Sequence, residues 1–231
     1  MRTAARVALL LACAALPLPS ATAQTALANP ASKNCLDQGG FLSIEKDGSG
    51  GQFGVCHFED NRQCEEWALL RGECPAGGIK LTGYTTPAAR YCALRGGRYQ
   101  LLSGSPTAVE QGRCSFGRGS GSGNGNGNSK ACAALAFFNG LCTPDGAGET
   151  VHAVFRCDAG RTVDALFSNG TPASVSLVLS DGRALALPQA LSGSGARYAD
   201  AGERFVFWNK GLTAFIDEGG RTTYAGCSTP R

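Results

Sequence analysis

The sequence has little net charge, which limits the partners it can bind by long-range attraction. Only 17% of its 231 residues are charged, and the formal net charge is +3. Two basic residues, Arg2 and Arg6, lie in a segment interpreted below as a removed leader, and without them the net charge is +1. Nucleic-acid-binding proteins carry a strongly positive surface, so we expect no nucleic-acid partner.

Metal-binding patterns and long apolar runs are also missing. The chain has two histidines, His57 and His152, and no Cys-x-x-Cys pair. Zinc sites in cysteine-rich proteins use such pairs or clustered histidines, so we expect no metal and no other cofactor. No segment approaches the roughly 20 apolar residues that a membrane-spanning helix requires. We therefore expect no transmembrane segment.

The first residues have the pattern of a secretory signal peptide. A cationic start over residues 1–6 is followed by a mostly apolar run over residues 7–18 and by the small residues Ala21 and Ala23. This pattern predicts a leader over residues 1–23 and a periplasmic or secreted protein. The less favoured alternative is a lipoprotein anchored at Cys13, for which the apolar run after Arg6 is short.

Cysteine is abundant, with 11 residues, and ten remain when Cys13 is set aside. An even number in an exported protein predicts five disulfides. The ten are Cys35, Cys56, Cys64, Cys74, Cys92, Cys114, Cys132, Cys142, Cys157 and Cys227.

The cysteine spacing reveals an internal repeat. The pattern around the first four cysteines, in residues 28–78, returns around the next four, in residues 79–147, where the Gly/Ser/Asn-rich segment 119–129 is an added loop. The last two cysteines of each copy flank a short helical pattern, with Asp60 or Ser129 as the expected N-cap. Trp67, Leu69 and Leu70 would form its apolar face in the first copy. Three disulfide pairings remain open within each copy.

Beyond residue 148 the sequence has a β pattern. Apolar residues alternate with polar ones in six to eight short segments separated by turn residues, which predicts a small barrel or sandwich over residues 148–231. Cys157 and Cys227 stand at its two ends, and we expect them to be bonded to each other. The predicted fold is mainly β, with two small disulfide-rich α+β repeats before the C-terminal domain.

The first repeat resembles a small cysteine-rich domain of exported bacterial proteins, often labelled as haemolysins. The resemblance rests on Asn29-Pro-Ala-Ser, Cys35-x3-Gly-Gly, Cys64-x2-Trp and Gly72-x-Cys. The second copy departs from it because it lacks the tryptophan and carries the added loop. The resemblance implies no activity, and neither copy has the membrane-inserting stretch of a pore-former.

The C-terminal domain resembles the membrane-bound and periplasmic inhibitors of C-type lysozyme. The resemblance rests on Ser-Gly-Ala-Arg-Tyr at residues 194–198, on Phe-Trp-Asn-Lys-Gly at residues 207–211 and on the bracketing cysteines. It implies an eight-stranded antiparallel β-barrel and a C-type lysozyme as protein partner.

The same resemblance implies that loops carrying Ser194 and Lys210, with Gly211, enter the lysozyme cleft. A hydroxyl and an ammonium suit the two carboxylates with which lysozyme works. Gly195 would allow close backbone approach, and Tyr198 would be a rigid contact or a loop anchor. Trp208 and Phe205 are expected in the core or at the barrel rim.

Without their motifs, Ser194 would be an ordinary turn residue and Lys210 a solvated strand end. We expect no catalysis, because a Ser/Lys pair here lacks a visible oxyanion site and an orienting third group. The alternative function is a cell-envelope interaction or structural module whose repeats bind a surface component. The ligand of the repeats, the preferred lysozyme and the oligomeric state stay open.

Overall fold

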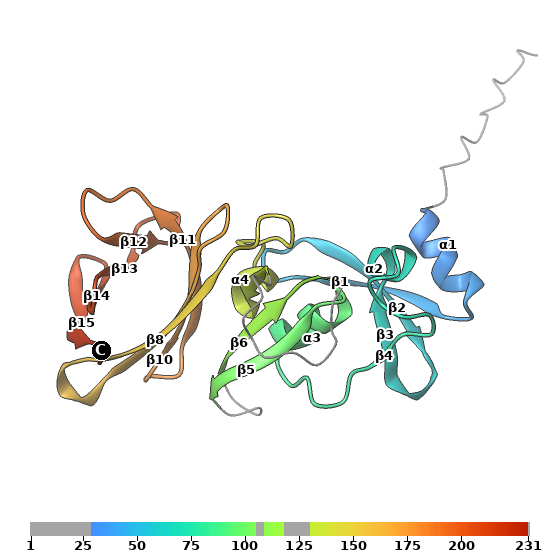
Figure 1. Ribbon diagram of the computed structural model, residues 1–231, viewed down its shortest axis with the longest axis horizontal. Coiled ribbons are helices and arrows are strands. Elements are labelled where there is room, and N and C mark those ends of the chain that lie inside the picture. The colour runs from blue at the N-terminus through green and yellow to red at the C-terminus, as the bar shows by residue number, and fades with distance from the viewer. Residues whose placement is uncertain (1–28, 105–108, 118–129, 231) are drawn as a thin grey trace, which may run out of the picture.

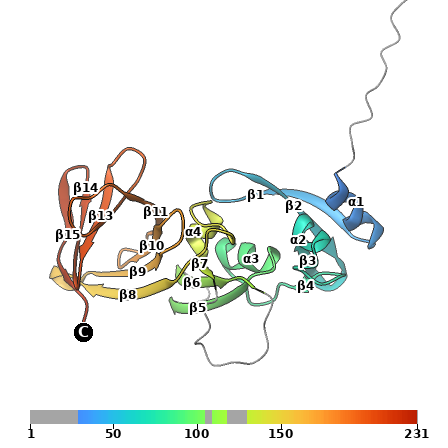
Figure 2. The ribbon, with the colours of Figure 1, turned by 45° about the horizontal axis from the view of Figure 1, so that its top comes forward.

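The computed structural model describes residues 29–104, 109–117 and 130–230, and arranges them as two small α+β units and a β-barrel in a row (Figure 1). The expected leader with Cys13 and the Gly-rich loop 119–129 lie outside these residues. Figure 2 shows the same linear order from a second direction, with α1 and the strands β13–β15 at opposite ends.

The two repeats share the order helix, two long strands, short strand, helix. The first contains α1 (Pro30–Asp37), β1 (Phe41–Lys46), β2 (Gln52–Phe58), η1 (Glu59–Asn61), β3 (Arg62–Glu65), α2 (Glu66–Leu70) and β4 (Ile79–Lys80). The second contains α3 (Pro87–Leu94), β5 (Arg98–Gly104), β6 (Glu110–Ser115), β7 (Ala131–Ala133) and α4 (Ala134–Phe138). The sheets run β1-β2-β3-β4 and β5-β6-β7. Because β4 pairs with β3, the first unit extends past the boundary expected at residue 78.

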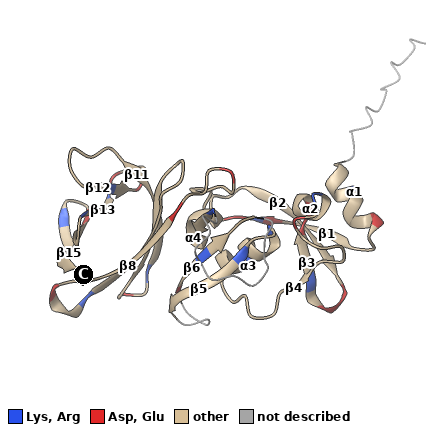
Figure 3. Cartoon of the chain, viewed as in Figure 1, with Lys and Arg blue, Asp and Glu red and all other residues tan. Residues whose placement is uncertain are grey.

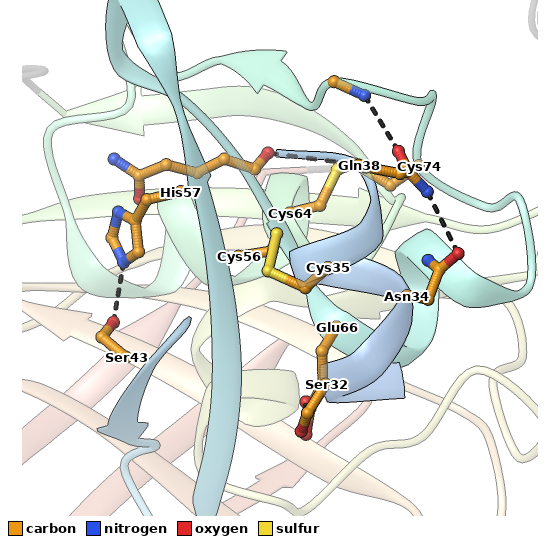
Figure 4. Close-up of a disulfide and its surroundings, with 12 residues drawn as sticks. Ser32, Asn34, Cys35, Gln38, Ser43, Cys56, His57, Cys64, Glu66 and Cys74 are labelled. Atoms are coloured by element: carbon orange, nitrogen blue, oxygen red, sulfur yellow. Dashed lines mark hydrogen bonds between the residues drawn. A yellow bond between two sulfur atoms is a disulfide. The ribbon is translucent and has the colours of Figure 1, made fainter. Parts of the chain in front are cut away.

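Disulfides join equivalent positions in the two units. Each first helix is bonded to the second strand, and each third strand is bonded to the loop after the second helix. The pairs are Cys35–Cys56 and Cys64–Cys74, then Cys92–Cys114 and Cys132–Cys142. One of the three pairings that the sequence left open is thus present in both units. Figure 4 shows the first of these bonds between α1 and the sheet.

A glycine beside the first disulfide of each unit explains part of the repeated pattern. A Cβ on Gly40 would lie 2.5 Å from the sulfur of Cys56, and a Cβ on Gly97 would lie 2.5 Å from the sulfur of Cys114. No side chain fits at such a distance. The second glycine of each Cys-x3-Gly-Gly motif is therefore required by the neighbouring disulfide, Cys35–Cys56 or Cys92–Cys114.

The short helix of the first unit begins later than expected. Asp60 is not its N-cap, because residues 62–65 form β3 and pair with β2. The cap is Glu65, whose carboxylate accepts hydrogen bonds from the amides of Trp67 and Ala68 at 3.1 and 2.9 Å. Ser129, expected to cap the second copy, lies outside the described residues, and the cap residue of α4 is Ala133.

The expected apolar face of the same helix is only partly correct. Leu69 is buried, but Trp67 is 39% exposed and Leu70 is 40% exposed. Glu66, the first residue of the helix, is buried as well, and its carboxylate accepts a hydrogen bond of 2.6 Å from Ser32 of α1 (Figure 4). The helix is thus held to α1 partly by polar contacts.

Eight antiparallel strands close the C-terminal barrel, as expected. They are β8 (Thr150–Arg156), β9 (Thr162–Ser168), β10 (Ser174–Leu179), β11 (Ala184–Ala190), β12 (Ala196–Ala199), β13 (Phe205–Lys210), β14 (Thr213–Glu218) and β15 (Arg221–Ser228), with η2 (Asp158–Gly160) between β8 and β9. Alternate side chains fill the interior, among them Phe155, Val163, Leu177, Phe207 and Ile216. The predicted disulfide Cys157–Cys227 is confirmed and spans 70 residues.

Each unit packs on the next through the face of its sheet. On the first sheet, Glu45 binds Arg90 of α3 through two hydrogen bonds of 2.5 and 2.8 Å. From the second sheet, Gln111 donates to the backbone oxygen of Ser176 in the barrel at 2.9 Å. Leu166 of β9 is fully buried in the core of the second unit. The second repeat therefore covers the β9–β10 side of the barrel.

Candidate functional site

The loop that carries Ser194 joins β11 to β12 and is held through its backbone. The carbonyl oxygen of Ser194 accepts hydrogen bonds from the Ser192 hydroxyl and from the indole N–H of Trp208, both at 2.9 Å. Gly195 follows with a φ of +72°, a conformation that glycine adopts without strain. This loop is thus anchored by its main chain, with the Ser194 side chain exposed.

Lys210 ends β13 and begins a two-residue turn. It pairs with Thr213 across β13 and β14, and Gly211 between them has a φ of +56°. The Thr213 hydroxyl donates to the backbone oxygen of Lys210 at 3.0 Å. The turn is therefore short and closed, and the exposed Lys210 side chain extends from its edge.

Strand register places this loop and this turn next to each other. Ala196 pairs with Asn209, so Ser194 lies two residues and Lys210 one residue beyond the same pair. Along β13 the buried Phe205 and Phe207 alternate with the half-buried Trp208 and exposed Lys210, so Trp208 and Lys210 share the outer face. Among the described residues, neither the Ser194 hydroxyl nor the Lys210 ammonium has a hydrogen-bond or ion-pair partner. Both polar groups are free to meet a partner.

Unlike Ser194 and Lys210, Tyr198 does not lie on the surface of the barrel. It is 3% exposed, and its ring packs in the barrel core against Phe167 and Phe207. Burial raises the pKa of its hydroxyl above the usual value. Tyr198 is therefore not a surface contact, and of the two roles expected for it only the loop anchor fits this position.

Trp208 lies closer to the candidate site than the sequence analysis expected. It was expected in the core or at the rim, as was Phe205, which does lie in the core. The Trp208 ring instead lies on the outer face, stacked on Phe215 with ring centroids 5.3 Å apart. A shallow hollow runs beside this pair, lined also by Thr213, Asp217, Thr222 and Gly226. The spacing of Trp208 from Lys210, two residues along a strand, was the available signal that both share one face.

Charged neighbours of the site are paired with each other. Arg197 of β12, opposite Trp208, forms two hydrogen bonds of 3.0 Å with Glu203. This pairing lowers the pKa of the Glu203 carboxyl. In Figure 3, basic and acidic residues are interspersed along the ribbon.

The two histidines lie away from this site. His57 bonds the Ser43 hydroxyl at 2.7 Å in the first repeat (Figure 4), and His152 bonds Asp164 at 2.8 Å on the barrel. Within the described ranges, no group of three or more His, Cys, Asp or Glu side chains is arranged to hold a metal ion. No helix in that part of the chain is long and apolar enough to cross a membrane.

The closed barrel, its terminal disulfide and the paired loops define a small disulfide-bonded β-domain that presents two free polar groups on adjacent loops. Residues 155–224 match the family described as membrane-bound lysozyme-inhibitor of c-type lysozyme, and residues 26–73 match a domain of unknown function (DUF333). No curated protein matches the chain.

Among solved structures, the chain is similar to the periplasmic lysozyme inhibitor of C-type lysozyme from Salmonella typhimurium. The match has 22% identity and a TM-score of 0.30, and it covers 36% of this chain and all of that chain. From its family match, the C-terminal domain is a lysozyme-inhibitor-like barrel, as the sequence predicted.

Proposed function

We propose that this exported protein inhibits a C-type lysozyme by inserting the Ser194 loop and the Lys210 turn into the active-site cleft of the enzyme. The observation that carries the proposal is the pairing of Ala196 with Asn209, which brings these two free polar side chains to one place on a barrel of the inhibitor family. Gly195 and Gly211 let the backbone of both loops approach a partner closely.

The chemistry of lysozyme supports these roles. The enzyme uses one protonated and one ionised carboxyl group on either side of the bond it cleaves. An ammonium such as that of Lys210 binds the ionised group, and a hydroxyl such as that of Ser194 can donate to one carboxyl and accept from the other. The inhibitor acts by occupying the cleft and performs no catalysis of its own.

The position of the repeats is compatible with this function. The second repeat covers the β9–β10 side of the barrel, and β13 is the fourth strand from β9 in both directions around the closed sheet. The candidate site therefore lies on the side of the barrel opposite the repeat. A lysozyme bound there would not have to displace it.

The test uses the purified chain from residue 24 onward. Mixed with a C-type lysozyme at increasing molar ratio, it should slow the lysis of a cell-wall suspension until lysis stops near equimolar ratio. The control is the same titration with a lysozyme of unrelated fold. Unchanged lysis at all ratios would contradict the proposal and favour the alternative, a cell-envelope interaction module. Mass analysis of the mature protein would show whether it begins at residue 24, as a periplasmic or secreted protein would, or at a lipidated Cys13.

A further inference from the structure

Among the described residues, one side-chain hydrogen bond attaches the Ser194 loop to a residue outside it. Of the two donors to the Ser194 carbonyl, Ser192 belongs to the loop, whereas Trp208 belongs to the neighbouring strand β13. The indole N–H therefore connects the loop to the barrel wall. The side chains of Ser194 and Leu191 are exposed, the latter at 96%, so neither of them anchors the loop.

Gly195 brings the loop backbone against the same indole. A Cβ at this position would lie 3.0 and 3.1 Å from two ring carbons of Trp208, and 2.5 Å from the backbone oxygen of Asn209. The absence of a side chain thus allows the main chain to lie on the ring. Contact and hydrogen bond together fix the loop relative to Trp208.

Trp208 is itself held in place. It pairs with Phe215 across β13 and β14 and with Arg197 across β12 and β13, and its ring stacks on that of Phe215 at an interplanar angle of 27°. Its side chain is half-buried on a strand within a closed barrel. A rigid support of this kind reduces the conformational freedom that the loop would lose on binding.

We propose that Trp208 is a positioning residue for inhibition, which fixes the Ser194 hydroxyl in its binding position through the hydrogen bond to the Ser194 carbonyl. The inference rests on the proposed function and adds to it a residue that acts through Ser194. Lys210 does not depend on it, because the β13–β14 turn is closed by its own hydrogen bond from Thr213. Loss of Trp208 should therefore affect one of the two inhibitory groups.

The experiment replaces the indole by a ring without the N–H. Trp208→Phe, or benzothienylalanine at the same position, should weaken inhibition by roughly threefold to tenfold, the range expected for one neutral hydrogen bond. The matched control is Trp67→Phe, at the only other tryptophan, in the first repeat. It should leave inhibition unchanged. Circular dichroism and thermal unfolding check that each variant keeps its fold.

Double variants separate positioning from direct contact. In a Ser194→Ala background, Trp208→Phe should weaken inhibition by less than about twofold, because the group it positions is gone. In a Lys210→Ala background it should keep its full effect. An equal loss in the Ser194→Ala background would overturn the proposal, since Trp208 would then act without Ser194.

A readout without lysozyme keeps the inference separate from the proposed function. The chain has two tryptophans, so Trp67→Phe leaves one indole N–H signal in the NMR spectrum, and it should exchange slowly with solvent. Backbone order parameters of residues 193–195 should fall in Trp208→Phe. Fast exchange of the indole proton, or an equally ordered loop in the variant, would refute the positioning role even if the wild-type chain inhibits. Ordered and protected signals in a chain that does not inhibit would instead refute the proposed function.

Discussion

Ser194 and Lys210 offer different kinds of hydrogen bond, and this difference sets the relative effect of removing each. A hydrogen bond to a charged group contributes about 1.5 to 3 kcal/mol, and a neutral one contributes about 0.5 to 1.5 kcal/mol. The free ammonium of Lys210 would face an ionised carboxylate, whereas the Ser194 hydroxyl is neutral. Both lie on loops whose backbones are already fixed.

We predict that Lys210→Ala weakens inhibition by about tenfold to a hundredfold and Ser194→Ala by at most about tenfold. Inhibition constants of the two variants against one C-type lysozyme test this order. Arg204→Ala is the charge-matched control, because Arg204 is 85% exposed in the turn at the other end of the β12–β13 hairpin. Wild-type inhibition by both folded variants would place the binding surface elsewhere.

At the scale of single residues, the sequence analysis identified candidate residues that belong to a motif. It missed the residue whose part depends on contacts in the folded chain. Ser194, Lys210, Gly195 and Gly211 were proposed as site residues from two short motifs, and the strand register places these motifs side by side. Their contact with lysozyme stays a prediction. Tyr198 came from the same motif but points inward, because strand alternation turns it toward the core. The role of Trp208 depends on a hydrogen bond to a loop 14 residues away, which no local pattern reveals.

At the scale of elements, the repeats are joined by an ion pair whose strength depends on pH. The hydrogen bonds from Arg90 lower the pKa of the Glu45 carboxyl, and both side chains are less than a third exposed. A lowered folded-state pKa means that the pair stabilises the fold above the ordinary pKa of glutamate. That contribution is lost as the pH falls through the folded-state pKa.

We predict that Glu45→Gln lowers the free energy of unfolding by about 1 kcal/mol near pH 7, and that the difference from wild type disappears in acid, below the folded-state pKa of Glu45. Urea unfolding under both conditions measures it. Asp37→Asn provides the control, because its pair with Lys33 on α1 is more than half exposed and should contribute little. A difference that persists in acid would mean that Glu45 acts by packing and not by charge.

Elements were predicted best where their pattern is periodic. The barrel strands followed from alternation, whereas α1 and α3 were not predicted, although Asn29-Pro30 and Thr86-Pro87 are N-cap and first-turn signals. Asp60 was expected as the cap of α2. Glu65 caps the helix instead, because β3 ends at Glu65, directly before the first helical residue. That condition comes from the sheet, which the local sequence does not describe.

For the whole molecule, the disulfides differ mainly in the length of chain that they close. Cys157–Cys227 closes 70 residues and Cys64–Cys74 closes 10. On the chain-entropy model, replacing Cys157 and Cys227 by serine should lower the free energy of unfolding by about 4 kcal/mol. The same change at Cys64 and Cys74 should lower it by about 3 kcal/mol. Trp208 and Trp67 report on the barrel and on the first repeat, so urea unfolding followed by fluorescence can separate the two effects. A smaller loss for the longer loop would contradict the entropic account.

The contact between the second repeat and the barrel predicts that the barrel is not independent of its neighbour. Cutting the chain to residues 148–231 would expose Leu166, at a cost of about 2 kcal/mol, and would remove the hydrogen bond from Gln111. We expect this fragment to unfold at a lower temperature than residues 79–231, and Leu166→Ser to improve its solubility. Equal unfolding temperatures of the two fragments would show that the contact adds no stability.

The placement of β13 opposite β9 also determines which surfaces would stay accessible under the proposed function. Figures 1 and 2 show α1 at one end of the long axis and β13–β15 at the other. A lysozyme bound at the Ser194 loop and the Lys210 turn would leave the exposed Leu36, Phe41 and Trp67 of the first repeat uncovered. The second repeat separates this surface from the barrel, so a lysozyme bound at the Ser194 loop and the first repeat would not compete for space.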